Sequence, residues 1–150
     1  MKIRGPTVKS TDCSDSYKRS PCLTRQDHHM IERIHPYIDG DDSAAFAEFY
    51  SGVFGLEVAM ESPVLGLRAP GNPAAQVIVL RPGTETPTPR FGIDMGDPAL
   101  VDAAYAEAIQ RGAKVVYPLT DEPWGVRRFF VEDPGGTVIN VLAHIEAMGG

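Results

Sequence analysis

The chain has little cysteine and no long apolar run. Its 150 residues contain two cysteines, Cys13 and Cys22, and both precede residue 30. We therefore expect neither a disulfide-held secreted scaffold nor a zinc site built from cysteines in the rest of the chain. No hydrophobic stretch approaches the roughly 20 residues that cross a bilayer. These absences favour a cytoplasmic protein without a membrane partner.

Positive charge is also scarce outside the first segment. The net charge is −6, residues 1–29 carry a net +3, and the remainder is therefore strongly acidic. A protein that binds nucleic acid needs a basic stripe to contact phosphates, so this partner is not expected. The sequence also has no GxSxG nucleophile elbow and neither glycine-rich phosphate motif, GxGxxG or GxxxxGK.

Residues 1–29 have no hydrophobic period from which a core could be built. We interpret them as a disordered or non-native N-terminal extension. Met30 is then the natural start of the folded unit, which we place at residues 30–147.

The most informative stretch lies near the C-terminus. Two runs rich in valine, isoleucine and phenylalanine, 126–132 and 137–144, flank the turn sequence Asp133-Pro134-Gly135-Gly136. Proline and glycine supply the backbone angles that a tight reversal needs. The stretch predicts a β-hairpin.

Two segments of the chain share one order of predicted elements. In the first, a strand over 31–38 precedes a helix that runs from the N-cap Asp42 to Gly55, and strands follow at 56–61, 64–69 and 75–80. In the second, a strand over 90–95 precedes a helix from Asp97-Pro98 to Gly112, and strands follow at 114–119 and in the hairpin.

The corresponding helix starts lie 55 residues apart and the helix ends 57 apart, as a duplication predicts. A proline- and threonine-rich linker, 82–89, separates the two modules, 31–81 and 90–145. The pattern predicts one α+β domain of two βαβββ modules.

These residues resemble a known family. The string FYSGVFGLEV at the first helix end, the string QRGAKVVYPLTDEPWGVRRFFVEDPGGTVINV and the paired βαβββ order are similar to the vicinal oxygen chelate superfamily. That group takes in glyoxalase I, bleomycin-resistance proteins and extradiol dioxygenases. The resemblance covers residues 31–145. It implies that the strands curve into an open, barrel-like cleft that binds a small molecule, and that the chain forms a homodimer.

In the metal-dependent members of this family, ligands come from the first and last strand of each module. Counting from the helix starts, the resemblance places His35, Val79, Arg90 and Asn140 at those four positions. A catalytic divalent ion needs about three nitrogen or oxygen ligands, and this set does not supply them. We therefore expect no metal cofactor. A shifted register is the alternative, with His35 and His144 as ligands of Mn, Fe, Ni or Zn.

The candidate ligand-binding residues are those expected to face the cleft: His35, Tyr37, Arg90, Asp94, Trp124 and Asn140. Arg90 either grips a ligand carboxylate or phosphate, or pairs with Asp94. Trp124, in a PWG string that bleomycin-resistance-like members share, either caps the core or stacks on an aromatic or cationic ligand. Arg127 and Arg128 alternate along a strand, so at most one of them faces the cleft.

The sequence supports two functions, and a structural or regulatory domain with an unused cleft is a third interpretation. The first is metal-free binding of a small molecule, with antibiotic sequestration as one form. The second is a metal-dependent lyase, isomerase or extradiol-type dioxygenase. Whether the protein is an enzyme, and which ligand it takes, are not decided by these residues.

Overall fold

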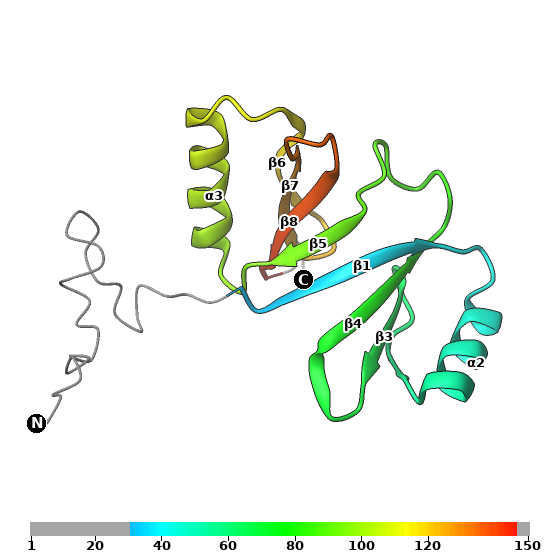
Figure 1. Cartoon of the computed structure of the whole chain (residues 1–150). Helices are drawn as coiled ribbons and strands as arrows, with labels where there is room; N and C mark the ends of the chain where they lie inside the picture. Colours follow the sequence, from blue (N-terminus) through cyan, green and yellow to red (C-terminus); the bar gives the residue numbers. More distant parts are fainter. Residues whose placement is uncertain (1–30, 147–150) are drawn as a thin grey trace, which may run out of the picture.

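The computed structural model describes residues 31–146, and the predictions for residues 1–29 lie outside this range (Figure 1). The first module contains β1 (Arg33–Asp39), α2 (Ser43–Phe54), β2 (Glu57–Met60), β3 (Leu65–Ala69) and β4 (Asn72–Leu80). The second contains β5 (Phe91–Asp94), α3 (Pro98–Gln110), β6 (Val115–Glu122), β7 (Val126–Glu132) and β8 (Val138–His144). The predicted βαβββ order is confirmed in both modules.

The strands form a single mixed sheet in the order β2-β3-β4-β1-β5-β8-β7-β6. Each module contributes one half, with β1 parallel to β4 and β5 parallel to β8. The halves meet where β1 runs antiparallel to β5 at the centre of the sheet, and β2 and β6 form its two edges. The α+β prediction is confirmed, and within residues 31–146 the sheet is not closed into a barrel.

Both helices begin at the predicted residues, and α2 ends at the predicted Gly55, whereas α3 ends at Gln110, two residues before the predicted Gly112. The Asp42 carboxylate accepts the amide of Ala45 at 3.0 Å, and the Asp97 carboxylate accepts the amide of Ala99 at 2.8 Å. Each bond satisfies an amide that the first helical turn leaves free. Gly55 ends α2 in the left-handed conformation with φ 73°, which a side chain would disfavour.

Each helix covers one half of the sheet. Val101 of α3 is fully buried against Phe129, Val141 and Ala143 of β7 and β8. Phe46 and Tyr50 of α2 pack on Leu65, Leu67 and Val79, but no residue of α2 is itself buried. The second module therefore has the tighter helix–sheet contact, and the helices leave the opposite face of the sheet for the site.

The C-terminal hairpin is confirmed, and its turn is held by Asp133. The Asp133 carboxylate accepts the amides of Gly135 and Thr137, each at 2.9 Å. Gly136 alone of the two turn glycines has a positive φ, 82°. β7 and β8 then pair from Glu132 with Val138 to Val126 with His144.

Two strands are longer than predicted. β4 begins at Asn72 because Ala69 and Asn72 already pair across the β3–β4 turn. β6 continues to Glu122, and a register shift between Tyr117 and Thr120 accommodates Pro118 on this edge strand.

The register of β4 corrects one prediction. Tyr37 pairs with Ile78, just as Gly92 pairs with Asn140 in the second module, so Ile78 rather than Val79 corresponds to Asn140. Val79 pairs with Ile38 and packs beneath α2. Successive strand residues face opposite sides of the sheet, so a shift of one residue exchanges the two faces.

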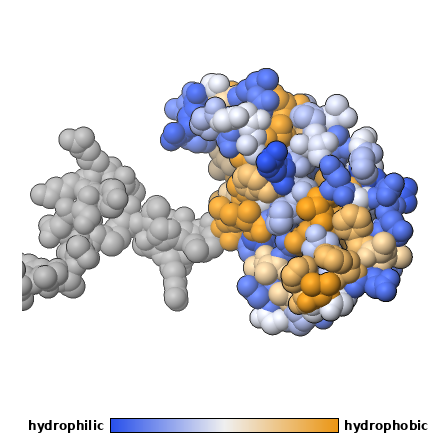
Figure 2. All heavy atoms as spheres, turned by 45° about the vertical axis from the view of Figure 1, so that its right-hand side comes forward, coloured by the Kyte–Doolittle hydropathy of each residue, from blue (hydrophilic) through white to orange (hydrophobic). Residues whose placement is uncertain are grey.

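Apolar side chains also reach the surface, where they form separate patches among hydrophilic residues (Figure 2). On α2 these are Phe49, Val53 and Phe54, and Val58 on the edge strand β2 is exposed beside them in sequence. Neither helix in residues 31–146 combines the length and apolar character needed to span a membrane.

Candidate functional site

A cleft of about 900 Å³ opens on the face of the sheet away from the helices. Its lining comes from β1, β2, β3, β4, β5, β7 and β8, from the β2–β3 and β6–β7 loops, from the linker between the modules and from the start of α2 at Ser43. Its apolar wall includes Ile78, Val126 and Leu142. A concave, partly apolar space with a few polar groups is the usual form of a small-molecule site.

Three polar side chains meet at the centre of this cleft. The Asn140 amide donates from Nδ2 to the Tyr37 hydroxyl at 2.8 Å, and His35 Nε2 lies 3.1 Å from the same hydroxyl. His35 and Asn140 are each 5% exposed. His35 Nδ1 and Asn140 Oδ1 are buried without a hydrogen-bond partner among residues 31–146. Buried polar atoms are seldom left unpaired in native proteins, so these two atoms mark a site.

Burial controls the charge of the central groups. It lowers the pKa of His35 to about 4, with Arg33 adding to the effect and Asp94 opposing it. It also raises the pKa of Tyr37 to about 12, against the hydrogen bond from Asn140. At neutral pH the cleft centre therefore holds a neutral imidazole and a protonated phenol.

Gly92 of β5 makes room for this arrangement. It stands opposite His35 in the β1–β5 pair, and a Cβ atom there would lie 2.5 Å from both His35 Nε2 and the Tyr37 hydroxyl. Real Cβ atoms essentially never approach other atoms so closely. A residue with a side chain at position 92 would push the His35–Tyr37 pair apart.

Beside this centre, Asp94 is fully buried and paired. Arg33 Nε donates to its Oδ2 at 2.8 Å, and the Gly96 amide donates to its Oδ1 at 2.9 Å. His144 Nε2 lies 3.9 Å from Asp94 Oδ2, but the His144 side chain is 64% exposed. Asp94 therefore pairs with Arg33, where the sequence suggested Arg90.

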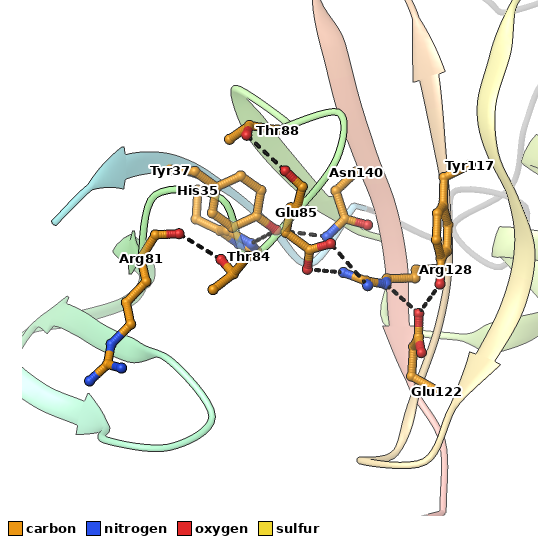
Figure 3. A network of polar contacts seen from close by, with 10 residues as sticks. All are labelled: His35, Tyr37, Arg81, Thr84, Glu85, Thr88, Tyr117, Glu122, Arg128 and Asn140. Atoms are coloured by element: carbon orange, nitrogen blue, oxygen red, sulfur yellow. Dashed lines mark hydrogen bonds and ion pairs between the residues drawn. The ribbon is translucent and has the colours of Figure 1, made fainter. Parts of the chain in front are cut away.

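On the other side of the centre, Arg128 joins the linker to the second module (Figure 3). Its Nη1 donates to Glu85 at 2.8 Å and its Nε donates to Glu122 at 2.9 Å. The Tyr117 hydroxyl donates to the same Glu122 oxygen at 2.5 Å. The guanidinium also lies 4.9–5.3 Å from the ring centres of Tyr117, Trp124 and Phe130. Burial opposes the charge of Arg128, but the two carboxylates outweigh it and raise its pKa.

Arg127, the next residue, faces the other side of the sheet. It pairs with Asp121 of β6 and Asp102 of α3. The prediction that at most one of these two arginines faces the cleft is confirmed, and the one that does so is Arg128.

Of the predicted candidates, His35, Tyr37, Asp94, Trp124 and Asn140 all line the cleft, and so does His144. Arg90 does not, which corrects its predicted position. Its backbone pairs with both Tyr37 and Val138 just before β5 begins, while its side chain stays exposed. An unpaired guanidinium is more stable in water than within a cleft.

The donor set does not fit the divalent metal that the family resemblance suggests. Position 78 is isoleucine and Arg90 does not line the cleft, so His35 and Asn140 are the remaining donors of the expected set. Residues 31–146 contain no group of three histidine, cysteine, aspartate or glutamate side chains placed to hold a metal ion. A catalytic divalent site ordinarily takes about three such ligands.

Three members of the Arg128 network were not predicted from the sequence: Glu85, Glu122 and Tyr117. Glu85 lies in the proline- and threonine-rich linker, where no strand or helix period indicates which way a side chain points. Glu122 lies beyond the predicted end of β6. The one available signal was Glu122, which lies close in sequence to Arg127 and Arg128. A buried guanidinium requires an acidic partner, so an acidic residue near two arginines is a candidate for that role.

Comparison with known proteins gives the family. A family model described as Glyoxalase/Bleomycin resistance protein/Dioxygenase superfamily matches residues 28–141. No curated protein matches the chain.

Solved structures have the same fold. A methylmalonyl-CoA epimerase from Mycobacterium tuberculosis aligns with TM-score 0.60 and 20% identity, over 73% of this chain and 85% of the other. A structure named NAD-dependent benzaldehyde dehydrogenase, from Legionella pneumophila, aligns with TM-score 0.62 and 13% identity, over 74% of this chain and 98% of the other.

A superfamily member from Vibrio splendidus aligns with TM-score 0.55 and 21% identity, over 75% of this chain and 98% of the other. At these identities the structural matches establish the fold and leave the activity open. The family model, the two βαβββ modules and the open eight-stranded sheet together show that this chain belongs to the glyoxalase/bleomycin resistance protein/dioxygenase superfamily.

Proposed function

We propose that the cleft binds a small organic molecule directly through its side chains, without a divalent metal. The observation that carries this proposal is the pair of buried, unpartnered atoms, His35 Nδ1 and Asn140 Oδ1, in a cleft of about 900 Å³. Both atoms are covered by protein in this structure, so a ligand with matching polar atoms would satisfy them once the His35 ring or the Asn140 amide turns toward the cleft, and this gain is large where water is excluded.

An aromatic ligand suits the cleft better than a cationic one. Trp124 lines the cleft and is 50% exposed, so part of its ring is available for stacking. The Arg128 guanidinium already lies 5.3 Å from the centre of that ring. A second cation at Trp124 would meet the charge of Arg128, whereas an aromatic ring would gain stacking and apolar contact. Sequestration of an aromatic antibiotic is one form that this binding would take.

A thermal-shift screen of aromatic drugs and metabolites against the full chain tests the proposal. We expect a saturable rise in melting temperature with an aromatic compound, and a smaller rise with the Trp124→Ala variant. Ile109→Ala is the matched control, because Ile109 is 54% exposed and lies on α3, away from the cleft lining. An equal response of both variants would count against binding at Trp124.

The alternative is a metal-dependent lyase, isomerase or extradiol-type dioxygenase. The same two unpartnered atoms favour it, because an imidazole nitrogen and an amide oxygen are both metal donors. Metal content by plasma mass spectrometry, on protein purified without chelator, separates the two functions. Near-stoichiometric Mn, Fe, Ni or Zn that is lost in His35→Gln would establish the alternative.

We also propose that the chain forms a homodimer through the exposed apolar surface of α2. Phe49, Val53 and Phe54 are 53–63% exposed there, and burial of such side chains is a usual driving force for association. Light scattering after size exclusion should give a dimer mass, and Phe54→Ser should shift it to the monomer. A cytoplasmic location, without nucleic-acid or membrane partners, stays a prediction from composition.

A further inference from the structure

The hydrogen bonds at the cleft centre fix which atoms donate and which accept. Asn140 Nδ2 can only donate, so the Tyr37 hydroxyl oxygen accepts this bond at 2.8 Å. The hydroxyl proton then needs an acceptor, and His35 Nε2 lies 3.1 Å away. With Nε2 as the acceptor, both the oxygen and the proton of the hydroxyl are paired. With a proton on Nε2 instead, the buried hydroxyl proton would lack a partner among the described residues.

This assignment determines the tautomer of His35. A neutral imidazole carries one proton, and burial keeps this ring neutral by lowering its pKa to about 4. If Nε2 accepts from Tyr37, the proton lies on Nδ1, which is the buried nitrogen without a partner. His35 therefore presents an N–H donor. Asn140, whose Nδ2 is engaged with Tyr37, presents its Oδ1 as an acceptor.

The two unpaired atoms belong to one constellation. Both side chains bond the same Tyr37 hydroxyl. His35 Nδ1 belongs to the same imidazole ring as the bonded Nε2, and Asn140 Oδ1 belongs to the same amide group as the bonded Nδ2. Both residues are 5% exposed and line the cleft. From this geometry we infer that the cleft centre recognises an uncharged group with an acceptor beside a donor, such as a carboxamide. The inference rests on the proposed small-molecule binding and specifies the chemical class of the ligand.

The same arrangement disfavours charged groups of similar shape. A carboxylate has two acceptor oxygens, so one of them would face Asn140 Oδ1 without a proton between them. An amidinium has donors alone, so one of them would face the Nδ1–H group of His35. In a buried site each mismatch leaves a polar atom unpaired, and this discriminates strongly between ligands.

The tautomer of the ligand-free protein is the first test. Long-range proton–nitrogen correlation spectra of the full, nitrogen-15-labelled chain distinguish protonated from unprotonated ring nitrogens. The chain has four histidines, and the signal that disappears in His35→Gln identifies His35. We expect its proton on Nδ1, and loss of this preference in Tyr37→Phe. A proton on Nε2 in the wild-type protein would overturn the inference whatever the ligand.

The second test uses three probes of one shape: benzamide, benzoate and benzamidine. On the same phenyl ring, benzamide presents a donor and an acceptor, benzoate presents acceptors alone, and protonated benzamidine presents donors alone. In nuclear magnetic resonance titrations at millimolar concentration, we expect benzamide to bind at least about fivefold more tightly than either charged probe, the effect of one buried mismatch. Asn140→Asp should shift the preference toward benzamidine.

The outcomes separate this inference from the proposed function. Binding in the cleft with benzoate or benzamidine equal to benzamide would refute the carboxamide preference and leave small-molecule binding intact. If none of the three probes shifts cleft signals such as that of Gly92, the inference fails together with direct binding at this centre.

Discussion

Replacing Arg128 by methionine should destabilise the fold severely. Methionine retains much of the arginine stem but removes the charge that pairs with Glu85 and Glu122. The Arg128 and Glu122 side chains are 9% and 8% exposed, so water compensates little of the loss. Removing one partner of a buried ion pair costs about 3–5 kcal/mol, a large part of a total stability of about 5–15 kcal/mol.

Urea denaturation followed by circular dichroism measures this loss. Arg127→Met is a matched control, because Arg127 is the adjacent residue but pairs with Asp102 and Asp121 on the more exposed face. We expect a much smaller change there, as for surface ion pairs in general. Adding Glu85→Gln to Arg128→Met should recover part of the stability, since it removes one of the two unpaired charges. Equal losses for the two arginine variants would refute the account of this network.

Three further predictions concern the cleft and the helices. Gly92→Ala should lower the free energy of unfolding by about 1–3 kcal/mol, because its Cβ would lie 2.5 Å from His35 Nε2, whereas Gly71→Ala, with nothing within 4 Å, should change it little. Urea denaturation of both variants checks this, and a well-tolerated Gly92→Ala would contradict the close contact. Because burial lowers the pKa of His35 from 6.5 to about 4, the unfolded chain binds the proton more readily between these values. The wild type should therefore lose up to about 3 kcal/mol as the pH falls from 6.5 to 4, and a smaller loss in His35→Gln over the same titration confirms the source. Asp97→Ala should cost about 1 kcal/mol by removing the N-cap of α3, and a thermal melt that matches the wild type would show that the cap contributes nothing.

The fold was predictable because its signals are local. Asp42 and Asp97 mark helix starts, Gly55 marks a helix end, and Asp133 to Gly136 form the hairpin turn. Each of these residues acts on backbone groups within a few residues of it. The repeated order of these signals was enough to give both modules. Such features depend little on what packs against them.

The site was less predictable because it depends on register and on distant partners. Residues 77–80 of β4 are all apolar, so alternation does not show which of Ile78 and Val79 faces the cleft. Arg128 and Glu85 lie 43 residues apart, and no local pattern connects them. His35, Tyr37 and Asn140 were found because family resemblance and strand alternation both place them on one face.

A titration of the full chain with benzamide in the presence of a metal chelator tests the central claim most directly. The claim is that side chains of the cleft bind a small molecule without a metal. Nuclear magnetic resonance should show saturable shifts at cleft residues, including Gly92 beside the His35–Tyr37 pair, and the chelator should leave the affinity unchanged. Binding that vanishes with chelator and returns with added divalent metal would contradict the account.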